Sequence, residues 1–188
     1  STNTSGGSNV AVGNYSLNLN TTGAENTALG YHALASNTVA NQNTAIGAYS
    51  LYSNVNGDNN IAIGHDALRN NSSGNRNVAL GYHALRSNTT AQYNTATGDR
   101  ALKDNTTGQY NTANGSSALE ANQNGQYNTA TGSNALSINR SGSANTATGH
   151  DALRDNSSGS QNTAIGHNAL KLTNASTNTA VGLSLIHI

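Results

Sequence analysis

The sequence predicts an all-β repeat protein, a parallel β-solenoid in which each 17-residue repeat makes one turn. Two observations lead to this prediction. A glycine returns every 17 residues from Gly13 to Gly166, with a last step of 16 residues to Gly182. Around each glycine the same pattern recurs, N-T-A-x-G-x-x-A-L-x-x-N-x-x-G-x-x. A strict period of this length is typical of stacked units that share one continuous core.

The segment N-T-A-x-G alternates with period two, which predicts a short strand of about five residues. Asn, Ala and Gly then share one face, and Thr and the variable residue share the other. The variable residue is aliphatic in some repeats, as in Val12 and Leu29, and polar in others, as in Thr97 and Asn114. We therefore expect this outer row to be partly exposed or to face a partner subunit.

The arm that follows, x-x-A-L-x-x-N, is compatible with one or two helical turns or with a second short strand. Because Ala and Leu favour helix, we expect a short helical turn in each repeat. The Asn-x-x-Gly that comes next is typical of a chain reversal.

Identical residues in stacked repeats form rows along the rod. A row of Asn can form an amide-to-amide ladder, and the Asn four residues before each glycine is the predicted structural ladder: Asn9, Asn26, Asn43, Asn60, Asn77, Asn94, Asn111, Asn128, Asn145, Asn162 and Asn178. The Leu four residues after each glycine is the predicted core: Leu17, Leu34, Leu51, Leu68, Leu85, Leu102, Leu119, Leu136, Leu153 and Leu170. A second Asn row, from Asn20 to Asn156, is expected to form a similar ladder at a corner.

Residues 1–182 are predicted to be a single solenoid of about eleven repeats, a fragment truncated at both ends. Strands stacked at about 4.8 Å would give a rod on the order of 50 Å long. The non-repeat tail, residues 183–188, resembles the translated end of a sequencing adapter, and we expect it to be a sequence artefact.

Composition excludes several classes of function. The chain has 34% apolar and 9% charged residues, and its eight basic residues balance eight acidic ones. This balance gives no electrostatic basis for binding nucleic acid, and no apolar run is long enough for a membrane helix. Each repeat also contains little apolar material, which predicts a homo-oligomer rather than a lone monomer.

Candidate binding residues lie in rows as well. Arg69, Arg86 and Lys103 form a short basic stripe that suits a polyanionic glycan, and Tyr93, Tyr110 and Tyr127 form an aromatic row that suits sugars or cross-rung stacking. Several residues of the second Asn row form N-x-[ST] sequons, which suggests glycosylation as an alternative role. His150 and His167 stack but lack a third fixed ligand, so we expect no metal site, no cofactor and no catalytic residues.

The runs 43–47, 162–166 and 9–13, N-T-A-I-G in the first two and N-V-A-V-G in the third, resemble the repeats of trimeric autotransporter adhesin heads and of phage tail fibres. The resemblance covers residues 3–182, although the A-L-x-x-N-x-x-G arm is not part of the adhesin pattern. It implies a parallel β-roll, a homotrimer, and adhesion to a host or matrix surface.

The sequence thus predicts a structural or adhesive fibre segment, extracellular and exposed on a cell surface or virion, without catalysis. Two alternatives remain open. Thr pairs such as Thr129 and Thr131 suggest an ice-binding face, and uncapped solenoid ends suggest a fibril that assembles end to end. The expected partners are further copies of the chain, with the trimer favoured, and a glycan or host-surface ligand.

Overall fold

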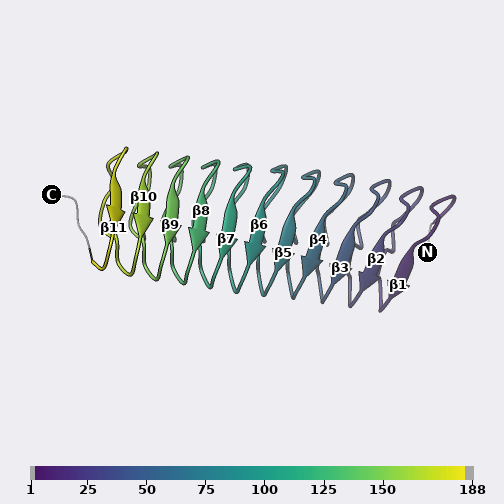
Figure 1. Cartoon of the computed structure of the whole chain (residues 1–188). Helices are drawn as coiled ribbons and strands as arrows, with labels where there is room; N and C mark the ends of the chain where they lie inside the picture. The colour runs from purple at the N-terminus through teal and green to yellow at the C-terminus, as the bar shows by residue number, and fades with distance from the viewer. Residues whose placement is uncertain (1–2, 185–188) are drawn as a thin grey trace.

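The computed structural model describes residues 3–184, which form one rod of stacked 17-residue turns, here called rungs (Figure 1). Eleven parallel strands pair in chain order in a single sheet, so the predicted parallel β-solenoid is confirmed. The strands are β1 (Val10–Val12), β2 (Thr27–Leu29), β3 (Thr44–Ile46), β4 (Ile61–Ile63), β5 (Val78–Leu80), β6 (Thr95–Thr97), β7 (Thr112–Asn114), β8 (Thr129–Thr131), β9 (Thr146–Thr148), β10 (Thr163–Ile165) and β11 (Thr179–Val181).

The strands pair without any shift in register, so that equivalent residues face each other, as Ala28 faces Ala45. Each strand has three residues rather than the expected five because the glycine that follows leaves the β region, with φ of 131° at Gly98. A Cβ added at Gly98 would lie 2.7 Å from the backbone of Gly115 in the next rung. The positive φ, together with this close backbone approach, explains why the first glycine recurs in every rung.

The expected helical turn is wrong, because the described residues contain no helix and therefore none that could span a membrane. The arm instead alternates its backbone handedness, with positive φ at the second and fourth residues after the glycine, as at His32 and Leu34. This alternation turns the peptide groups along the rod axis. His32 N–H donates to Asn14 of the rung before and Leu34 N–H donates to Ser50 of the rung after. A helix would use these groups within the rung.

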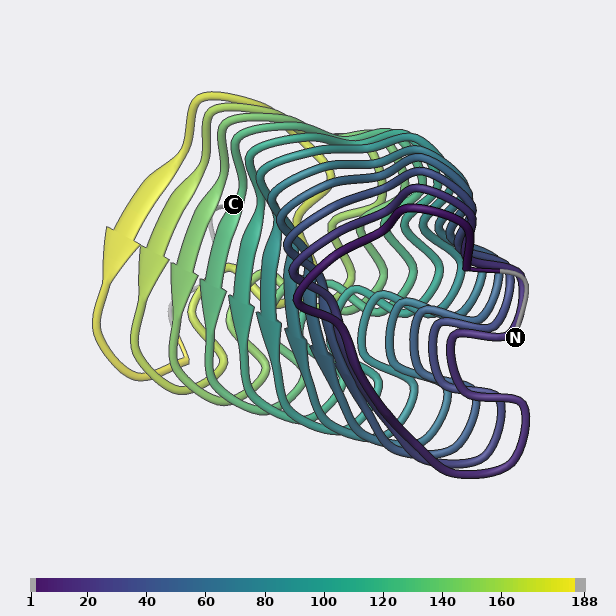
Figure 2. The same ribbon diagram turned by 90° about the vertical axis from the view of Figure 1, so that its right-hand side faces the viewer.

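The core lies between the sheet and the arms, and every rung repeats the same backbone outline around it (Figure 2). The predicted core leucines lie inside it with the Ala of each strand, and those from Leu34 to Leu170 are at most 1% exposed. Two rows of Asn share this interior, and most of their members are fully buried. The interior therefore combines one large apolar side chain per rung with two amides that need hydrogen-bond partners.

Candidate functional site

The second Asn row lies buried inside the rod, beside the first Asn row, and forms a continuous amide ladder. Asn71 Nδ2 donates to Asn54 Oδ1 one rung before, at 2.9 Å, and to the carbonyl oxygen of Gly74, also at 2.9 Å. Asn88 Nδ2 then donates to Asn71 Oδ1 at 2.7 Å. The ladder expected for this second row is confirmed.

The first Asn row, the predicted structural ladder, precedes the strands and combines amide-to-amide bonds with bonds to the backbone, as Asn60 Nδ2 donates to Asn43 Oδ1 at 3.2 Å. Asn60 N–H donates to Asn43 Oδ1 of the rung before at 2.9 Å, while Asn60 Nδ2 donates to the Gly74 carbonyl at 2.8 Å. Gly74 thus accepts from Asn60 and Asn71, which ties the two rows together. Only a short side chain with both a donor and an acceptor satisfies this arrangement.

Glycosylation of the second-row sequons is contradicted by this geometry. From Asn20 to Asn156 these side chains are 0% exposed, and the Nδ2 atom that a sugar would occupy already donates to carbonyl oxygens inside the rod. The sequons arise because Asn, Ser and Thr are favoured in the turn.

A third ladder lies on the surface at the residue eleven positions after each glycine, and sequence analysis missed it. Asn41 N–H donates to Asp58 Oδ1, and Asp58 N–H donates to Asn75 Oδ1, both at 2.7 Å. Ser143 and Ser160 make the same type of contact through their hydroxyl groups. The residues that accept these bonds are Asn, Asp and Ser, which share a short side-chain acceptor, whereas Gln occupies this row at positions 92, 109 and 126, so a search for identical residues does not find it.

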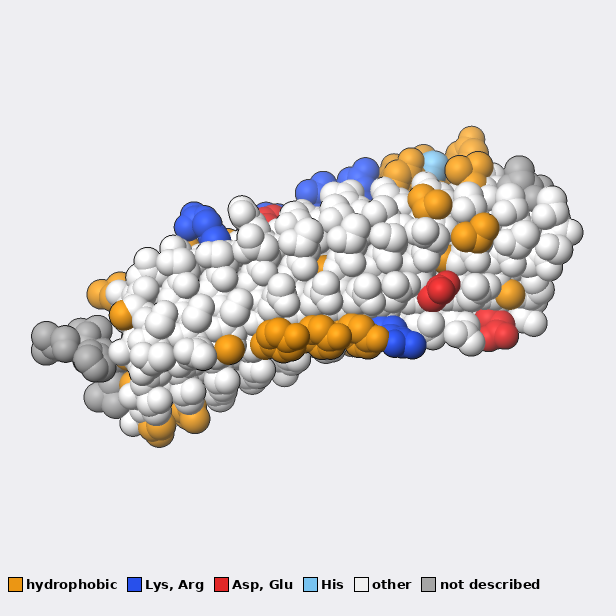
Figure 3. Space-filling view, turned by 90° about the horizontal axis from the view of Figure 1, so that it is seen from above, with side chains coloured by type: hydrophobic (Ala, Val, Ile, Leu, Met, Phe, Trp, Pro, Cys, Tyr) orange, Lys and Arg blue, Asp and Glu red, His pale blue; other side chains and the backbone are white. Residues whose placement is uncertain are grey.

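The tyrosine row forms a stacked column, seen as a narrow hydrophobic ridge with a basic side chain at one end (Figure 3). Tyr93, Tyr110 and Tyr127 have ring centroids 4.9 and 5.2 Å apart and planes within 5° of parallel. Arg76 covers the other face of Tyr93 at 5.4 Å from the ring centroid. The rings therefore cover one another's faces. The outer face of the Tyr127 ring lies next to Ala144, the small residue that occupies this row in the following rung, and this is the ring face left for a sugar.

The residues one, two and five positions after each glycine form a second surface, here called the corner surface. At its N-terminal end it carries an aromatic cluster in which His32 stacks on Tyr49, with ring centroids 5.4 Å apart. Tyr31 packs edge-on against both rings, and the Arg69 guanidinium lies 5.1 Å from the Tyr49 centroid. Sequence analysis missed this cluster because its members come from three different rows.

Asp66 lies at the centre of the next part of the corner surface and is only 4% exposed. Its Oδ2 atom lies 3.3 Å from His83 Nε2, 3.6 Å from Arg69 Nη1 and 3.5 Å from Arg86 Nε. Burial and the positive charge of Arg86 hold the pKa of the His83 imidazole below its ordinary value, although Asp66 acts in the other direction. Two members of the predicted basic stripe thus share one carboxylate.

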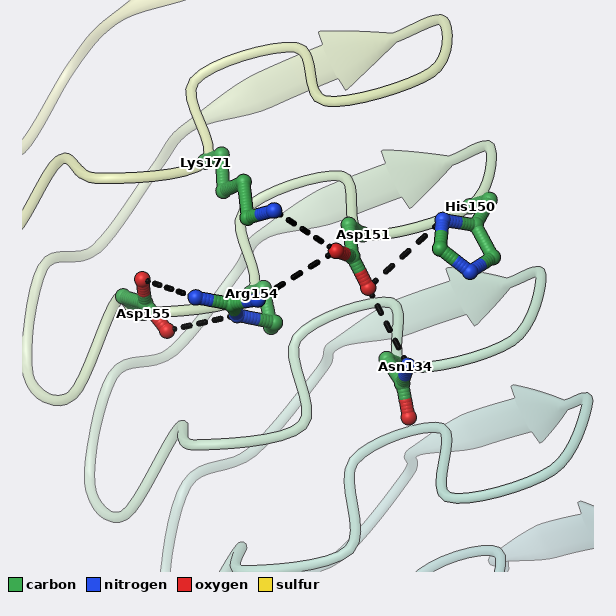
Figure 4. A network of polar contacts seen from close by, with 6 residues as sticks. All are labelled: Asn134, His150, Asp151, Arg154, Asp155 and Lys171. Atoms are coloured by element: carbon green, nitrogen blue, oxygen red, sulfur yellow. Dashed lines mark hydrogen bonds and ion pairs between the residues drawn. The ribbon is translucent and has the colours of Figure 1, made fainter.

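Asp151 repeats this arrangement five rungs later (Figure 4). Lys171 Nζ lies 2.8 Å and Arg154 Nη1 3.3 Å from Asp151 Oδ2, and Asn134 Nδ2 donates to Oδ1 at 3.1 Å. Burial alone would raise the pKa of the Asp151 carboxyl. Hydrogen bonds from Lys171 and Asn134, with the charges of His150 and Lys171, outweigh burial and place this pKa below its ordinary value.

The third member of the basic stripe, Lys103, lies 3.5 Å from Glu120 Oε1 and 3.7 Å from Asp104 Oδ1. Every member of the stripe therefore has a carboxylate partner, and the corner surface carries paired charges rather than a field of one sign. Binding of a glycan there would depend on aromatic rings and hydrogen bonds more than on net positive charge.

Comparison of the chain with protein-family models found no match, and comparisons with curated proteins and with solved structures found none either. The solenoid and its ladders are therefore the basis for any statement on function.

Proposed function

We propose that this chain is a segment of an extracellular structural or adhesive fibre that acts by its shape and by a repeated surface. One observation carries the proposal. Inward positions are the same from rung to rung, whereas outward positions vary over the same backbone. A protein built in this way keeps a constant rod and changes the side chains that it presents.

The outer face of the sheet supports association of several copies. Its strands expose aliphatic side chains towards both ends of the rod, with Val12 56% and Val181 65% exposed. A flat row of exposed aliphatic residues is typical of a surface that a partner covers. We propose a homotrimer in which this face lies at the interface, in keeping with the resemblance to adhesin heads and tail fibres.

Light scattering of the full chain tests this proposal. A mass of three times 19.1 kDa supports the trimer. Replacement of Leu29 and Ile63 by Thr, which the outer row already contains in other rungs, should then yield folded monomers. A folded monomer of the unaltered chain would refute the trimer and leave the face free for a ligand.

Adhesion is tested separately with immobilised glycans. Binding should depend on the Tyr127 ring face and on the stripe of Arg69, Arg86 and Lys103, and replacement of Tyr127 by Ala should weaken it more than replacement of Tyr110, whose ring faces are covered. Equal losses for the two tyrosines would contradict stacking of a sugar on the open ring.

A second candidate function rests on strands β6, β8 and β9, which direct two Thr side chains each towards solvent. Such a T-x-T array suits ice binding, and Thr131→Leu should then abolish thermal hysteresis. The third candidate, a fibril, rests on β1 and β11, each of which pairs on one side only. Filaments whose amount rises with protein concentration in negative stain would support it.

A further inference from the structure

Among the residues that the structure describes, one group of three His and Asp side chains brings its ligand atoms within 4.8 Å of one another: His65, Asp66 and His83. We propose that this group binds one divalent transition-metal ion, with Zn²⁺ as the physiological candidate. The sequence-based expectation of no metal site considered stacked histidines alone. It missed that a carboxylate from one rung lies between histidines of two rungs.

The distances suit such an ion. His83 Nε2 lies 3.3 Å and His65 Nδ1 3.7 Å from Asp66 Oδ2. Ligands at about 2.0–2.1 Å from a tetrahedral Zn²⁺ are roughly 3.4 Å apart. The two distances that end at Asp66 Oδ2 therefore need to change by only a few tenths of an ångström. Rotation of the His65 and His83 side chains brings their two ring nitrogens to the same separation.

The ligands are held by the regular part of the rung. Asp66 and His83 occupy the same position in consecutive rungs, both with positive φ, and their N–H groups donate to Ala48 and His65 of the preceding rungs. Asp66 Oδ1 is buried and has no hydrogen-bond partner. A buried carboxylate with an unused oxygen is an unusual arrangement in a folded protein, and a cation held at Oδ2, the oxygen that both histidines approach, would offset part of the cost of burying this charge.

Two arginines compete with the ion for the same oxygen. Arg69 Nη1 and Arg86 Nε lie 3.6 and 3.5 Å from Asp66 Oδ2, too far for good hydrogen bonds, and both side chains are about one-third exposed. They neutralise the carboxylate without an ion and can turn towards solvent when one binds. Removal of one arginine should therefore strengthen metal binding, an effect opposite to that of removing a ligand.

The chain contains a natural control. Residues 150–154 repeat the H-D-A-L-R segment of residues 65–69, but Asn168 stands where the first copy has His83, and Lys171 stands where it has Arg86. The second histidine of this copy is therefore His167, one position earlier than the equivalent of His83, and the Lys171 ammonium lies 2.8 Å from Asp151 Oδ2. We expect one ion per chain, bound by the first copy.

Calorimetric titration of the full chain with ZnCl₂, followed by the visible absorption of bound Co²⁺, tests the proposal. We expect one ion per chain, a loss in affinity of at least 100-fold in His83→Asn, because even outer-shell changes cost about 10–100-fold, and tighter binding in Arg86→Gln. Circular dichroism confirms that each variant is folded.

A variant that gains a metal site excludes misfolding as the reason for a change in metal binding. Asn168→His combined with Lys171→Arg places the same side chains around Asp151 that His83 and Arg86 place around Asp66, and should raise the stoichiometry from one ion to two. Absence of binding by the unaltered chain would overturn the proposal, as would an affinity that His83→Asn leaves unchanged or a stoichiometry that stays at one in the double variant.

Discussion

Replacement of Asn71 by Asp tests the buried amide ladder with almost no change in shape. The oxygen that replaces Nδ2 would lie 2.9 Å from Asn54 Oδ1 and 2.9 Å from the Gly74 carbonyl oxygen, so two hydrogen bonds become contacts between acceptors. The adjacent Asn70 is exposed, and Asn70→Asp makes the same chemical change in solvent. The two variants form a matched pair.

The expected cost follows from these contacts. Each of the two lost hydrogen bonds costs about 1 kcal/mol, and a buried acceptor left without a donor costs about 1–3 kcal/mol. A protonated carboxyl can donate one hydrogen bond and so recovers part of this loss, which leaves a destabilisation of about 2–3 kcal/mol. Burial without a positive partner raises the pKa of the new carboxyl above its unfolded value of about 3.9. Keeping it protonated at pH 7 then costs about 4 kcal/mol more.

Urea unfolding at several pH values, followed by circular dichroism, measures this cost. Because the folded pKa is raised, the deficit of Asn71→Asp is smallest below about pH 4 and grows as pH rises. Asn70→Asp should stay within about 0.5 kcal/mol of the unaltered chain. If Asn71→Asp were as stable as Asn70→Asp at pH 7, or its deficit did not change with pH, the ladder would not stabilise the rod in the way described.

Three further predictions concern other parts of the rung. Gly98→Ala should destabilise by more than about 2 kcal/mol, because its φ is 131° and an added Cβ would lie 2.7 Å from backbone. Gly108→Ala should cost less: an added Cβ would lie even closer to the Gly125 carbonyl oxygen, but Ala40 and Ala91 occupy the equivalent position in other rungs, so the backbone there can adjust. Equal urea midpoints for the two variants would contradict this. Leu85→Ala should cost about 2–5 kcal/mol in the same assay, and a smaller loss would show that the core collapses around the gap. Asp151→Asn should cost about 1–2 kcal/mol of stability near neutral pH. Because the pKa of Asp151 is lowered in the folded state, this difference in stability should disappear as pH falls below about 4. A difference that persists in acid would exclude charge as its source.

Much of the fold was predictable because stacking gives every repeat the same environment. Identical residues in a row then indicate identical roles, which is why the Asn ladder could be read from Asn9 to Asn178 and why the strand face with Ala inward was assigned correctly. The same logic could not predict the arm. Ala and Leu favour helix in isolation, but Leu34 has φ of 52°, because hydrogen bonds between rungs outweigh local preference.

The corner surface was less predictable for a related reason. Its contacts join residues of different rows in neighbouring rungs, as Asp66 joins His83 and Arg86. Reading rows one at a time made Arg69, Arg86 and Lys103 a basic stripe and left their carboxylate partners out. Distances across rungs, which depend on the direction of each side chain, were needed to show that these charges are paired.

The central claim is that one repeat equals one rung. Deletion of residues 98–114 removes one whole repeat and rejoins the pattern, whereas deletion of residues 98–105 removes half of one and breaks every ladder. We predict that the first variant unfolds cooperatively in urea with a stability close to that of the full chain, and that the second is much less stable. Equal stability of the two variants would contradict the claim.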